Sequence, residues 1–284
     1  MPELPEVETV RRGLETWCLN RTITKVQTLH HRATNPRSIS PLSELVGATI
    51  TKVSRRGKFL WLELDRPYCL VAHLGMSGQF RVQEPSIANE KHLRVRMTLD
   101  TKQELRYIDQ RTFGWLAINK YEGDIPTLVS EIAPDIFEES FDRGLAKAKF
   151  GSRKSEIKRA LLDQSLMSGV GNIYADESLW RAKIHPATPC DQVSPQKLES
   201  LFRAVDSVMS KALVEGGTSF DSLYINVNGE SGYFAHSLEA YGRTGEPCSR
   251  CGTPIERIVI AARSSHFCPQ CQRMQRFLSE ITPR

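Results

Sequence analysis

The chain is 284 residues long, 40% of them hydrophobic and 25% charged, which is the composition of a globular protein with a sizeable core. A disordered tail protein and a collagen-like fibre are excluded, and the formal charge of +5 is only a weak indication of an anionic partner. Since the sequence has no apolar run of about 20 residues and has an acidic start in place of a secretory signal, we expect a cytoplasmic protein without a membrane helix.

The chain begins with a predicted helix over residues 5–17. Val7, Val10, Leu14 and Trp17 recur at spacings of three and four residues, which places them on one face of a helix. We expect this face to pack against the core.

Residues 20–119 are predicted to form short β-strands. Their apolar runs are bounded by glycine, proline and asparagine. The run 58–64 is apolar on both alternating faces, which is typical of a strand inside a sandwich or barrel. The predicted strands are 22–29, 48–54, 58–64, 68–74, 79–82, 92–99, 105–109 and 114–118.

In the run 92–99, basic side chains alternate with apolar ones, so one face of this strand is predicted to be exposed and basic. Such a face is either simply solvated or contacts phosphate groups. The inward residues are Leu93, Val95, Met97 and Leu99, and the outward ones are His92, Arg94 and Arg96.

The second half of the chain changes to helical patterns. Residues 120–152 contain glycine and proline and are predicted to form a linker that enters a helical region. Helices are then expected over 155–164, 172–183 and 195–214. The stretch 216–240 is rich in glycine, asparagine and serine and is expected to be a long loop.

Four of the seven cysteines are grouped near the C-terminus with the spacing C-x2-C-x16-C-x2-C. Each pair offers two thiolates from one tight turn, and two such turns form a tetrahedral zinc site. Because all four ligands come from the protein, the predicted zinc ion is structural, whereas a catalytic zinc keeps a water ligand. Disulfides are the less favoured alternative. The four predicted ligands are Cys248, Cys251, Cys268 and Cys271.

A β-hairpin with Arg263, Ser264 and Ser265 at its tip is predicted between the two cysteine pairs. Residues 241–284 contain seven arginines, no lysine and three acidic residues. A guanidinium group binds two phosphate oxygens at once, so this composition favours phosphate contact. A zinc ribbon is also a common protein-interaction module, and that alternative stays open.

The first residues combine carboxylates with an unusual proline. Three carboxylates, Glu3, Glu6 and Glu8, lie at or just before the positive end of the predicted helix, which they stabilise. This effect is sufficient to explain Glu6 and Glu8. Pro2 becomes a secondary amine if Met1 is removed, and the helix end would lower the amine's pKa from the ordinary α-amino value of about 8. A neutral amine at physiological pH is a nucleophile that forms Schiff bases with masked aldehydes.

Six motifs in a consistent order resemble the formamidopyrimidine-DNA glycosylase family. The resemblance runs from Pro2 to Cys271 and so covers nearly the whole chain. The motifs are PELPEVE from Pro2, RRGKF with Lys58, HLGMSGQ with Met76, DQRTFG with Arg111 and Phe113, GVGNIYADE with Asn172, and the zinc ribbon.

This resemblance implies a bifunctional base-excision repair enzyme that removes oxidised purines, chiefly 8-oxoguanine and formamidopyrimidines, and then cuts the abasic strand. Pro2 would attack C1′ of the damaged nucleotide and form a covalent imine, Glu3 would protonate the sugar ring oxygen, and Glu6 would support the site. Lys58 would act in the β,δ-eliminations and on the flanking phosphate. Arg263 matches the family's catalytic zinc-finger arginine, which is assigned as the proton donor in the last elimination. Because the pKa of a guanidinium group is so high, we favour a phosphate clamp, and both roles stay open.

The resemblance also implies how the DNA is held. A base that leaves the stack must be replaced, and Met76, Arg111 and Phe113 match the inserted trio, with Arg111 hydrogen-bonding the orphaned cytosine. Without the resemblance, Met76 and Phe113 would be interpreted as ordinary core residues. The loop 216–240 would cover the flipped base.

Residues 155–183 resemble a helix-two-turn-helix. In it, Gly169 would end the first helix in the left-handed conformation, and Asn172 would cap the second and leave backbone N–H groups for a phosphate. The residues implied to contact the DNA backbone are His92, Arg153, Lys158, Asn172 and Tyr241.

These patterns predict an α+β fold. An N-terminal β-sandwich with its helix would cover 1–133, a helix-two-turn-helix domain with the long loop would cover 134–240, and a zinc-ribbon hairpin would cover 241–284. We expect one structural Zn²⁺, damaged double-stranded DNA as partner, a monomer, and a nucleoid-associated cytoplasmic location. Two alternatives stay open: an endonuclease VIII-type glycosylase for oxidised pyrimidines, which typically begins PEGPE, and a non-catalytic zinc-ribbon DNA-binding protein.

Overall fold

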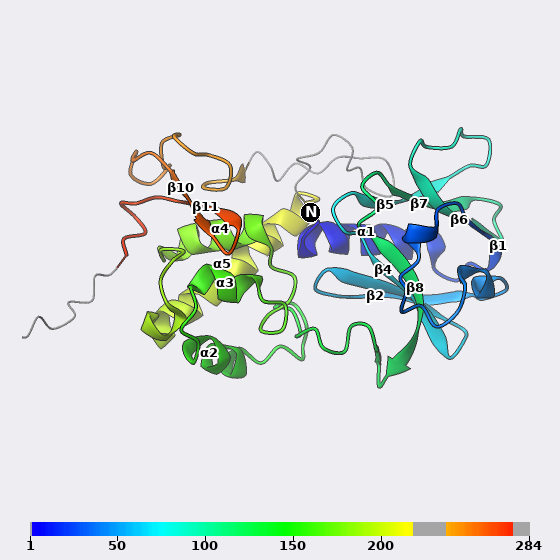
Figure 1. Cartoon of the computed structure of the whole chain (residues 1–284), viewed down its shortest axis with the longest axis horizontal. Helices are drawn as coiled ribbons and strands as arrows, with labels where there is room; N and C mark the ends of the chain where they lie inside the picture. Colours follow the sequence, from blue (N-terminus) through cyan, green and yellow to red (C-terminus); the bar gives the residue numbers. More distant parts are fainter. Residues whose placement is uncertain (1, 218–236, 275–284) are drawn as a thin grey trace, which may run out of the picture. The chain divides into compact units, whose positions relative to one another are not determined.

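The computed structural model of the chain describes residues 2–217 and 237–274 (Figure 1). The chain divides into two compact units. Unit 1 covers Met1–Asp135 and Met209–Ser237, and unit 2 covers Ile136–Val208 and Leu238–Arg284. The bounds of the three domains expected from the sequence stay predictions.

Unit 1 contains two antiparallel sheets, and all eight predicted strands are present. One sheet has the order β1-β6-β7-β5, and the other has the order β2-β3-β4-β8-β9. The strands are β1 (Ile23–Thr28), β2 (Ile50–Arg56), β3 (Phe59–Leu64), β4 (Tyr68–His73), β5 (Gly78–Gln83), β6 (Leu93–Leu99), β7 (Glu104–Asp109), β8 (Trp115–Glu122) and β9 (Ile125–Pro126).

Both sheets contribute to one apolar core, which confirms the predicted sandwich. Val53 and Leu62 enter this core from the five-stranded sheet, and Val95 and Met97 enter it from the four-stranded sheet. In β6 the predicted alternation is confirmed, because its apolar residues are buried and its two arginines are half-buried.

Strand β3 is buried on both faces, as its sequence predicted. Leu62 faces the main core, while Trp61 belongs to a second apolar cluster with Cys69, Val71 and Val129. The segment that follows β9 therefore covers the outer face of the five-stranded sheet, which explains why this strand has no polar face.

Helix α1 (Leu4–Cys18) packs against the sandwich through Val7, Val10 and Leu14, as predicted. The prediction for Trp17 is wrong, because this side chain is 43% exposed. The buried stripe continues instead at Cys18, four residues after Leu14, where the helix returns to the same face.

Unit 2 contains most of the helices and a separate two-stranded sheet. Helix α2 lies inside the predicted linker 120–152, where the Asp142 carboxylate accepts the Leu145 N–H at 2.9 Å and caps it. Among the described residues, no helix is long and apolar enough to cross a membrane. The elements are α2 (Arg143–Gly151), α3 (Ile157–Leu162), α4 (Asn172–Ala182), α5 (Pro195–Val214), which continues into unit 1, β10 (Glu256–Ile260) and β11 (Arg263–Phe267), with short 3₁₀ turns η1 (His31–Ala33), η2 (Leu42–Leu45) and η3 (Cys190–Gln192).

Candidate functional site

The start of α1 places two carboxylates beside Pro2. Glu3 is the N-cap residue, and it forms a reciprocal capping box with Glu6, whose Oε2 accepts the Glu3 backbone N–H at 2.8 Å. Pro2, Glu3 and Glu6 are all buried. Gly217 also lies against Glu6, because a Cβ added at this glycine would be 3.0 Å from Oε1. The capping box therefore fixes the three predicted site residues within one helical turn.

Lys58 lies in the turn between β2 and β3 and is buried. Burial, together with the charge of Lys58, lowers the pKa of His73 to about 4, so His73 is neutral at physiological pH. The neutral ring accepts the Gly75 N–H on Nδ1 at 3.2 Å. His73 thus fixes the start of the loop that carries Met76. His73 was not among the predicted site residues, and its one signal in the sequence is a histidine inside an apolar run.

The structure brings the predicted insertion residues of unit 1 together. Met76 is 41% exposed and Phe113 is 62% exposed, so the interpretation of both as core residues is wrong. Arg111 is also exposed, and its Nη1 lies 3.2 Å from the Met76 Sδ. An exposed thioether, a guanidinium and a phenyl ring on neighbouring loops have the chemistry of a group that enters a base stack.

A buried carboxylate joins the two loops that carry this trio. Asp109 is fully buried and accepts the Ser77 hydroxyl at 2.5 Å and the Gly114 N–H at 2.8 Å. The Ser77 oxygen in turn accepts the Arg111 N–H at 2.9 Å. Between Arg111 and Phe113, Thr112 has a φ of 56°, a strained value for a β-branched residue. The trio is therefore held by a rigid scaffold.

In unit 2, Lys158 is fully buried. Its Nζ lies 2.6 Å from the Asp176 Oδ1 and donates to the Ser264 carbonyl at 2.6 Å. Asp176 also accepts the backbone N–H of His266 at 2.9 Å. Lys158 thus connects α3 and α4 to β11, and its ammonium group is not exposed for a phosphate. Its position on the apolar side of α3, next to Ile157 and Leu161, was the available signal.

The neighbouring acid on α4 holds the segment before the zinc ribbon. The Glu177 carboxylate accepts three consecutive backbone N–H groups, from Glu239, Ala240 and Tyr241, at 2.8 to 3.2 Å. The Tyr241 ring packs edge-on against His266, with centroids 5.0 Å apart. Tyr241 is therefore fixed both through its backbone and through its ring.

The two turns of the predicted helix-two-turn-helix differ in detail from the expectation. Gly169 has a φ of 91°, but α3 ends seven residues earlier, at Leu162. Gly171, rather than Asn172, is the N-cap of α4, and Asn172 is the first helical residue. The Asn172 Oδ1 is buried without a hydrogen-bond partner among the described residues. Since the N-cap residue is a glycine, it provides no capping side chain to the first turn of α4.

Three arginines line one open pocket of about 540 Å³ in unit 2. Arg153 and Arg263 were predicted, and Arg159 of α3 was missed. Arg153 forms an ion pair with Asp163 at 3.2 Å, whereas Arg159 and Arg263 form none within the described part of the chain. The pocket therefore has a surplus of positive charge.

The hairpin tip differs from the prediction. The turn consists of Ala261 and Ala262, with φ values of 48° and 60°, and Ile260 pairs directly with Arg263. Two positive φ values define the tight turn that matches the twist of a hairpin. The predicted tip residues Arg263, Ser264 and Ser265 instead begin β11, because strand pairing continues up to the two-residue turn.

The four predicted ligands form a metal site. One Sγ atom from each of Cys248, Cys251, Cys268 and Cys271 lies within 4.8 Å of the others. Zn–S bonds of about 2.3 Å in a tetrahedron require sulfur atoms about 3.8 Å apart, so these residues fit one structural zinc ion. The other cysteines, Cys18, Cys69 and Cys190, are buried thiols whose pKa values burial raises.

Each unit thus gathers its own part of the predicted site. Unit 1 contains the start of α1, Lys58, His92 and the exposed trio, and unit 2 contains the buried lysine, Asn172, Tyr241, the arginine pocket and the zinc site. His92 is half-exposed at the start of β6, as expected for the basic face. The predicted lesion-covering loop 216–240 lies outside the described residues except at its two ends.

Comparison with known proteins gives the class of the fold in three parts. Family models match residues 1–116 as a formamidopyrimidine-DNA glycosylase N-terminal domain, residues 132–222 as an H2TH domain of that glycosylase, and residues 245–273 as a zinc finger found in FPG and IleRS. These matches describe a DNA glycosylase with an H2TH domain and a zinc finger.

Whole-chain relatives agree. Formamidopyrimidine-DNA glycosylase of Thermobifida fusca is 50% identical over 96% of this chain and 97% of its own, and that of Corynebacterium glutamicum is 51% identical over 96% and 99%. A solved complex of Lactococcus lactis Fpg with abasic-site DNA has a TM-score of 0.88 at 36% identity and covers 96% of this chain and 100% of that one. The chain belongs to the formamidopyrimidine-DNA glycosylase family.

Proposed function

We propose that the chain is a bifunctional DNA glycosylase and abasic-site lyase that removes oxidised purines from double-stranded DNA. The observation that carries the proposal is the start of α1, where Pro2 lies next to two buried carboxylates in a capping box. Once Met1 is removed, the secondary amine of Pro2 is the nucleophile. Glu3, the next residue in the sequence, is the acid.

The chemistry follows from these two groups. The Pro2 nitrogen bonds to C1′ of the damaged nucleotide while the bond from C1′ to the base breaks and the base leaves with a proton. Glu3 then donates a proton to the sugar ring oxygen, the ring opens, and an iminium ion forms. Glu6 holds the Glu3 backbone in place through its hydrogen bond.

The iminium ion acidifies the neighbouring C–H bonds. Loss of the C2′ proton expels the 3′-phosphate, and loss of the C4′ proton then expels the 5′-phosphate, so both strand ends carry phosphate. We assign Lys58 to proton transfer in these eliminations and to the flanking phosphate. Hydrolysis of the iminium ion returns the Pro2 amine.

The exposed trio of unit 1 would fill the hole left by the damaged nucleotide. Arg111 carries the donors that a cytosine oxygen and ring nitrogen accept, which favours lesions opposite cytosine. The strain at Thr112 and the Asp109 scaffold support a preformed wedge. Replacing Arg111 with alanine should therefore reduce discrimination among the four opposing bases by about 5- to 150-fold, since a pair of hydrogen bonds to a base is worth about 1–3 kcal/mol.

Phosphate contacts are assigned to both units. In unit 1 His92 has this role, and in unit 2 Arg153, Arg263, Asn172 and Tyr241 have it. We assign Lys158 a different role, because its ammonium group is buried: it positions β11, and so Arg263, through the Ser264 carbonyl.

A bound zinc ion would hold the two cysteine pairs together and so fix the ends of the hairpin. Its four protein ligands leave no position for a reacting group, which makes it structural. The protein is proposed to act as a monomer on chromosomal DNA, and therefore in the cytoplasm at the nucleoid.

A comparison of excision rates on two different lesions distinguishes this function from two alternatives. One solved complex of the Lactococcus lactis protein contains DNA with an oxidised pyrimidine, so the choice of lesion is open to measurement. We expect much faster excision from a duplex with 8-oxoguanine opposite cytosine than from one with thymine glycol. Faster excision of thymine glycol would favour the endonuclease VIII type, and excision of neither lesion would favour a non-catalytic DNA-binding protein.

A further inference from the structure

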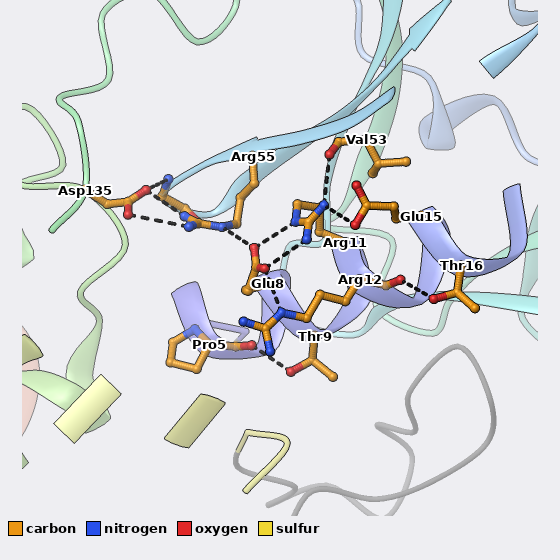
Figure 2. A network of polar contacts seen from close by, with 11 residues as sticks. Pro5, Glu8, Thr9, Arg11, Arg12, Glu15, Thr16, Val53, Arg55 and Asp135 are labelled. Carbon is orange, nitrogen blue, oxygen red and sulfur yellow. Dashed lines mark hydrogen bonds and ion pairs between the residues drawn. The ribbon is translucent and has the colours of Figure 1, made fainter. Parts of the chain in front are cut away.

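We infer that Arg55 is a positioning residue that sets the place of Pro2 relative to Lys58. Arg55 lies in β2, and its side chain is 8% exposed. The guanidinium bridges two carboxylates: its Nε lies 3.0 Å from the Glu8 Oε2, and its Nη1 lies 2.6 Å from the Asp135 Oδ2 (Figure 2). This inference rests on the proposed roles of Pro2 and Lys58.

One end of the bridge holds α1, whose N-cap Glu3 directly follows the nucleophile. Glu8 also accepts Arg11 Nε at 2.9 Å and Arg12 Nε at 2.9 Å. It lies five residues after Glu3, which is about 7.5 Å along a helix axis. Because a helix is rigid over this length and the capping box holds Glu3 to its first turn, a rotation or shift at Glu8 displaces Glu3 and the Pro2 bonded to it.

The other end of the bridge holds the turn that carries Lys58. The Asp135 carboxylate is fully buried, and its Oδ2 accepts the Gly57 backbone N–H at 2.9 Å. Arg55 also reaches the Gly57 carbonyl at 3.4 Å. Both polar groups of the residue before Lys58 are therefore bound to the same ion pair.

The charges show that the contacts persist at neutral pH. Burial opposes ionisation of Glu8, but hydrogen bonds and charges from Arg11 and Arg55 hold its pKa below the usual value. Burial likewise disfavours the charged form of Arg55, and Asp135 and Glu8 outweigh this effect and raise its pKa. Glu8 and Arg55 therefore stay charged throughout the physiological range.

Stability alone does not account for such a network. The desolvation cost of a buried ion pair often cancels the attraction between its charges. Apolar residues of similar volume commonly give the folded protein the same stability. What an ion pair adds is direction, because a guanidinium fork fits a carboxylate in few orientations. This series of contacts thus fixes the distance between Pro2 and Lys58, the two groups proposed to act on the same sugar. It runs through Glu8, Arg55, Asp135 and Gly57.

Two variants test the inference. Arg55→Lys keeps the charge but has no fork to bridge two carboxylates, and Asp135→Asn keeps the size but loses the charge. Arg12→Lys is the matched control, since Arg12 binds the same Glu8 but is 58% exposed and lies outside the bridge to Asp135. Each protein is studied well below its own melting temperature, with Met1 removal confirmed by mass.

Borohydride trapping on a duplex with an abasic site opposite cytosine measures imine formation at saturating DNA. Binding to a duplex with a tetrahydrofuran analogue of that site measures affinity. We expect trapping to slow at least about tenfold in Arg55→Lys and Asp135→Asn, with Kd changed less than about threefold, and strand cleavage to slow further than trapping. Arg12→Lys should behave as the wild type.

Trapping at the rate of the Arg12→Lys control in both variants would overturn the inference, as would a loss explained wholly by weaker binding. Absence of trapping in the wild-type protein would instead contradict the proposed function. The two failures are therefore distinguishable.

Discussion

The Nζ of Lys158 lies 2.6 Å from the Oδ1 of Asp176, and both side chains are fully buried. The same Nζ donates to the Ser264 carbonyl, and the other Asp176 oxygen accepts the backbone N–H of His266. One buried ion pair therefore connects α3 and α4 to the strand that begins at Arg263. The position of that arginine depends on helices more than 80 residues earlier in the chain.

Replacing Lys158 with methionine should destabilise unit 2 by about 3–5 kcal/mol, because Asp176 is left as a buried charge without its partner. Urea unfolding checks this value, with Lys154→Met, an exposed lysine, as the control. The slope of log K against log salt should fall by no more than about one, because the buried Lys158 acts on the DNA only through the position of Arg263. A loss of stability below about 1 kcal/mol would contradict the assignment of Lys158 to the hairpin.

The arginine pocket of unit 2 predicts a phosphate contact. Arg159→Ala should weaken binding to a tetrahydrofuran-containing duplex and reduce the slope of log K against log salt by about one, as expected for one lost phosphate contact. Arg203→Ala is the control, because this side chain is 75% exposed and already paired with Glu199. An unchanged slope for Arg159→Ala would show that this arginine does not reach the DNA.

His73 predicts a pH dependence of stability. Its pKa is about 4 in the folded protein, whereas an ordinary histidine has a pKa of 6.5, so between these values the unfolded chain binds more protons. Stability should therefore fall as pH falls from 6.5 to 4, by about 3 kcal/mol from this group. In His73→Asn, whose amide oxygen can replace Nδ1 as acceptor, this part of the fall should disappear. Parallel stability curves for the two proteins between these pH values would contradict the prediction.

The zinc site predicts a metal-dependent hairpin. Cys248→Ser should lose the bound zinc ion, which native mass spectrometry measures, and should bind abasic-site DNA at least about tenfold more weakly because Arg263 is no longer held. Cys69→Ala, at a buried cysteine of unit 1, should keep one zinc ion per chain. Unchanged DNA binding by a zinc-free Cys248→Ser protein would show that the ribbon is dispensable.

The strands of unit 1 were predictable because their apolar runs are short and bounded by turn residues. In β6 the alternation of leucine, valine and methionine with arginine is visible in the sequence and in the burial of the strand. The metal ligands were predictable for a similar reason, since the spacing within each cysteine pair is local. Trp17 was not, because a short helix permits more than one buried stripe and only the sandwich core decides which one is used.

Burial and partners that depend on distant residues were not predictable. Lys158 was predicted to contact DNA because it matches a basic position of the family, and nothing in its segment indicates its partner Asp176, which lies 18 residues away on another helix. Arg55 and Asp135 are separated by 80 residues, and nothing local in either segment indicates the other. Sequence patterns predict which face a side chain occupies, but an ion pair is determined by the packing of elements that the pattern does not relate.

The central claim is that the amine of Pro2 forms the covalent intermediate. Its most direct test is borohydride reduction of the Met1-processed protein with a duplex that carries 8-oxoguanine opposite cytosine, followed by peptide mass spectrometry of the adduct. The account predicts one cross-link per chain, located at the N-terminal proline. A cross-link at a lysine, or no cross-link at all, would contradict it.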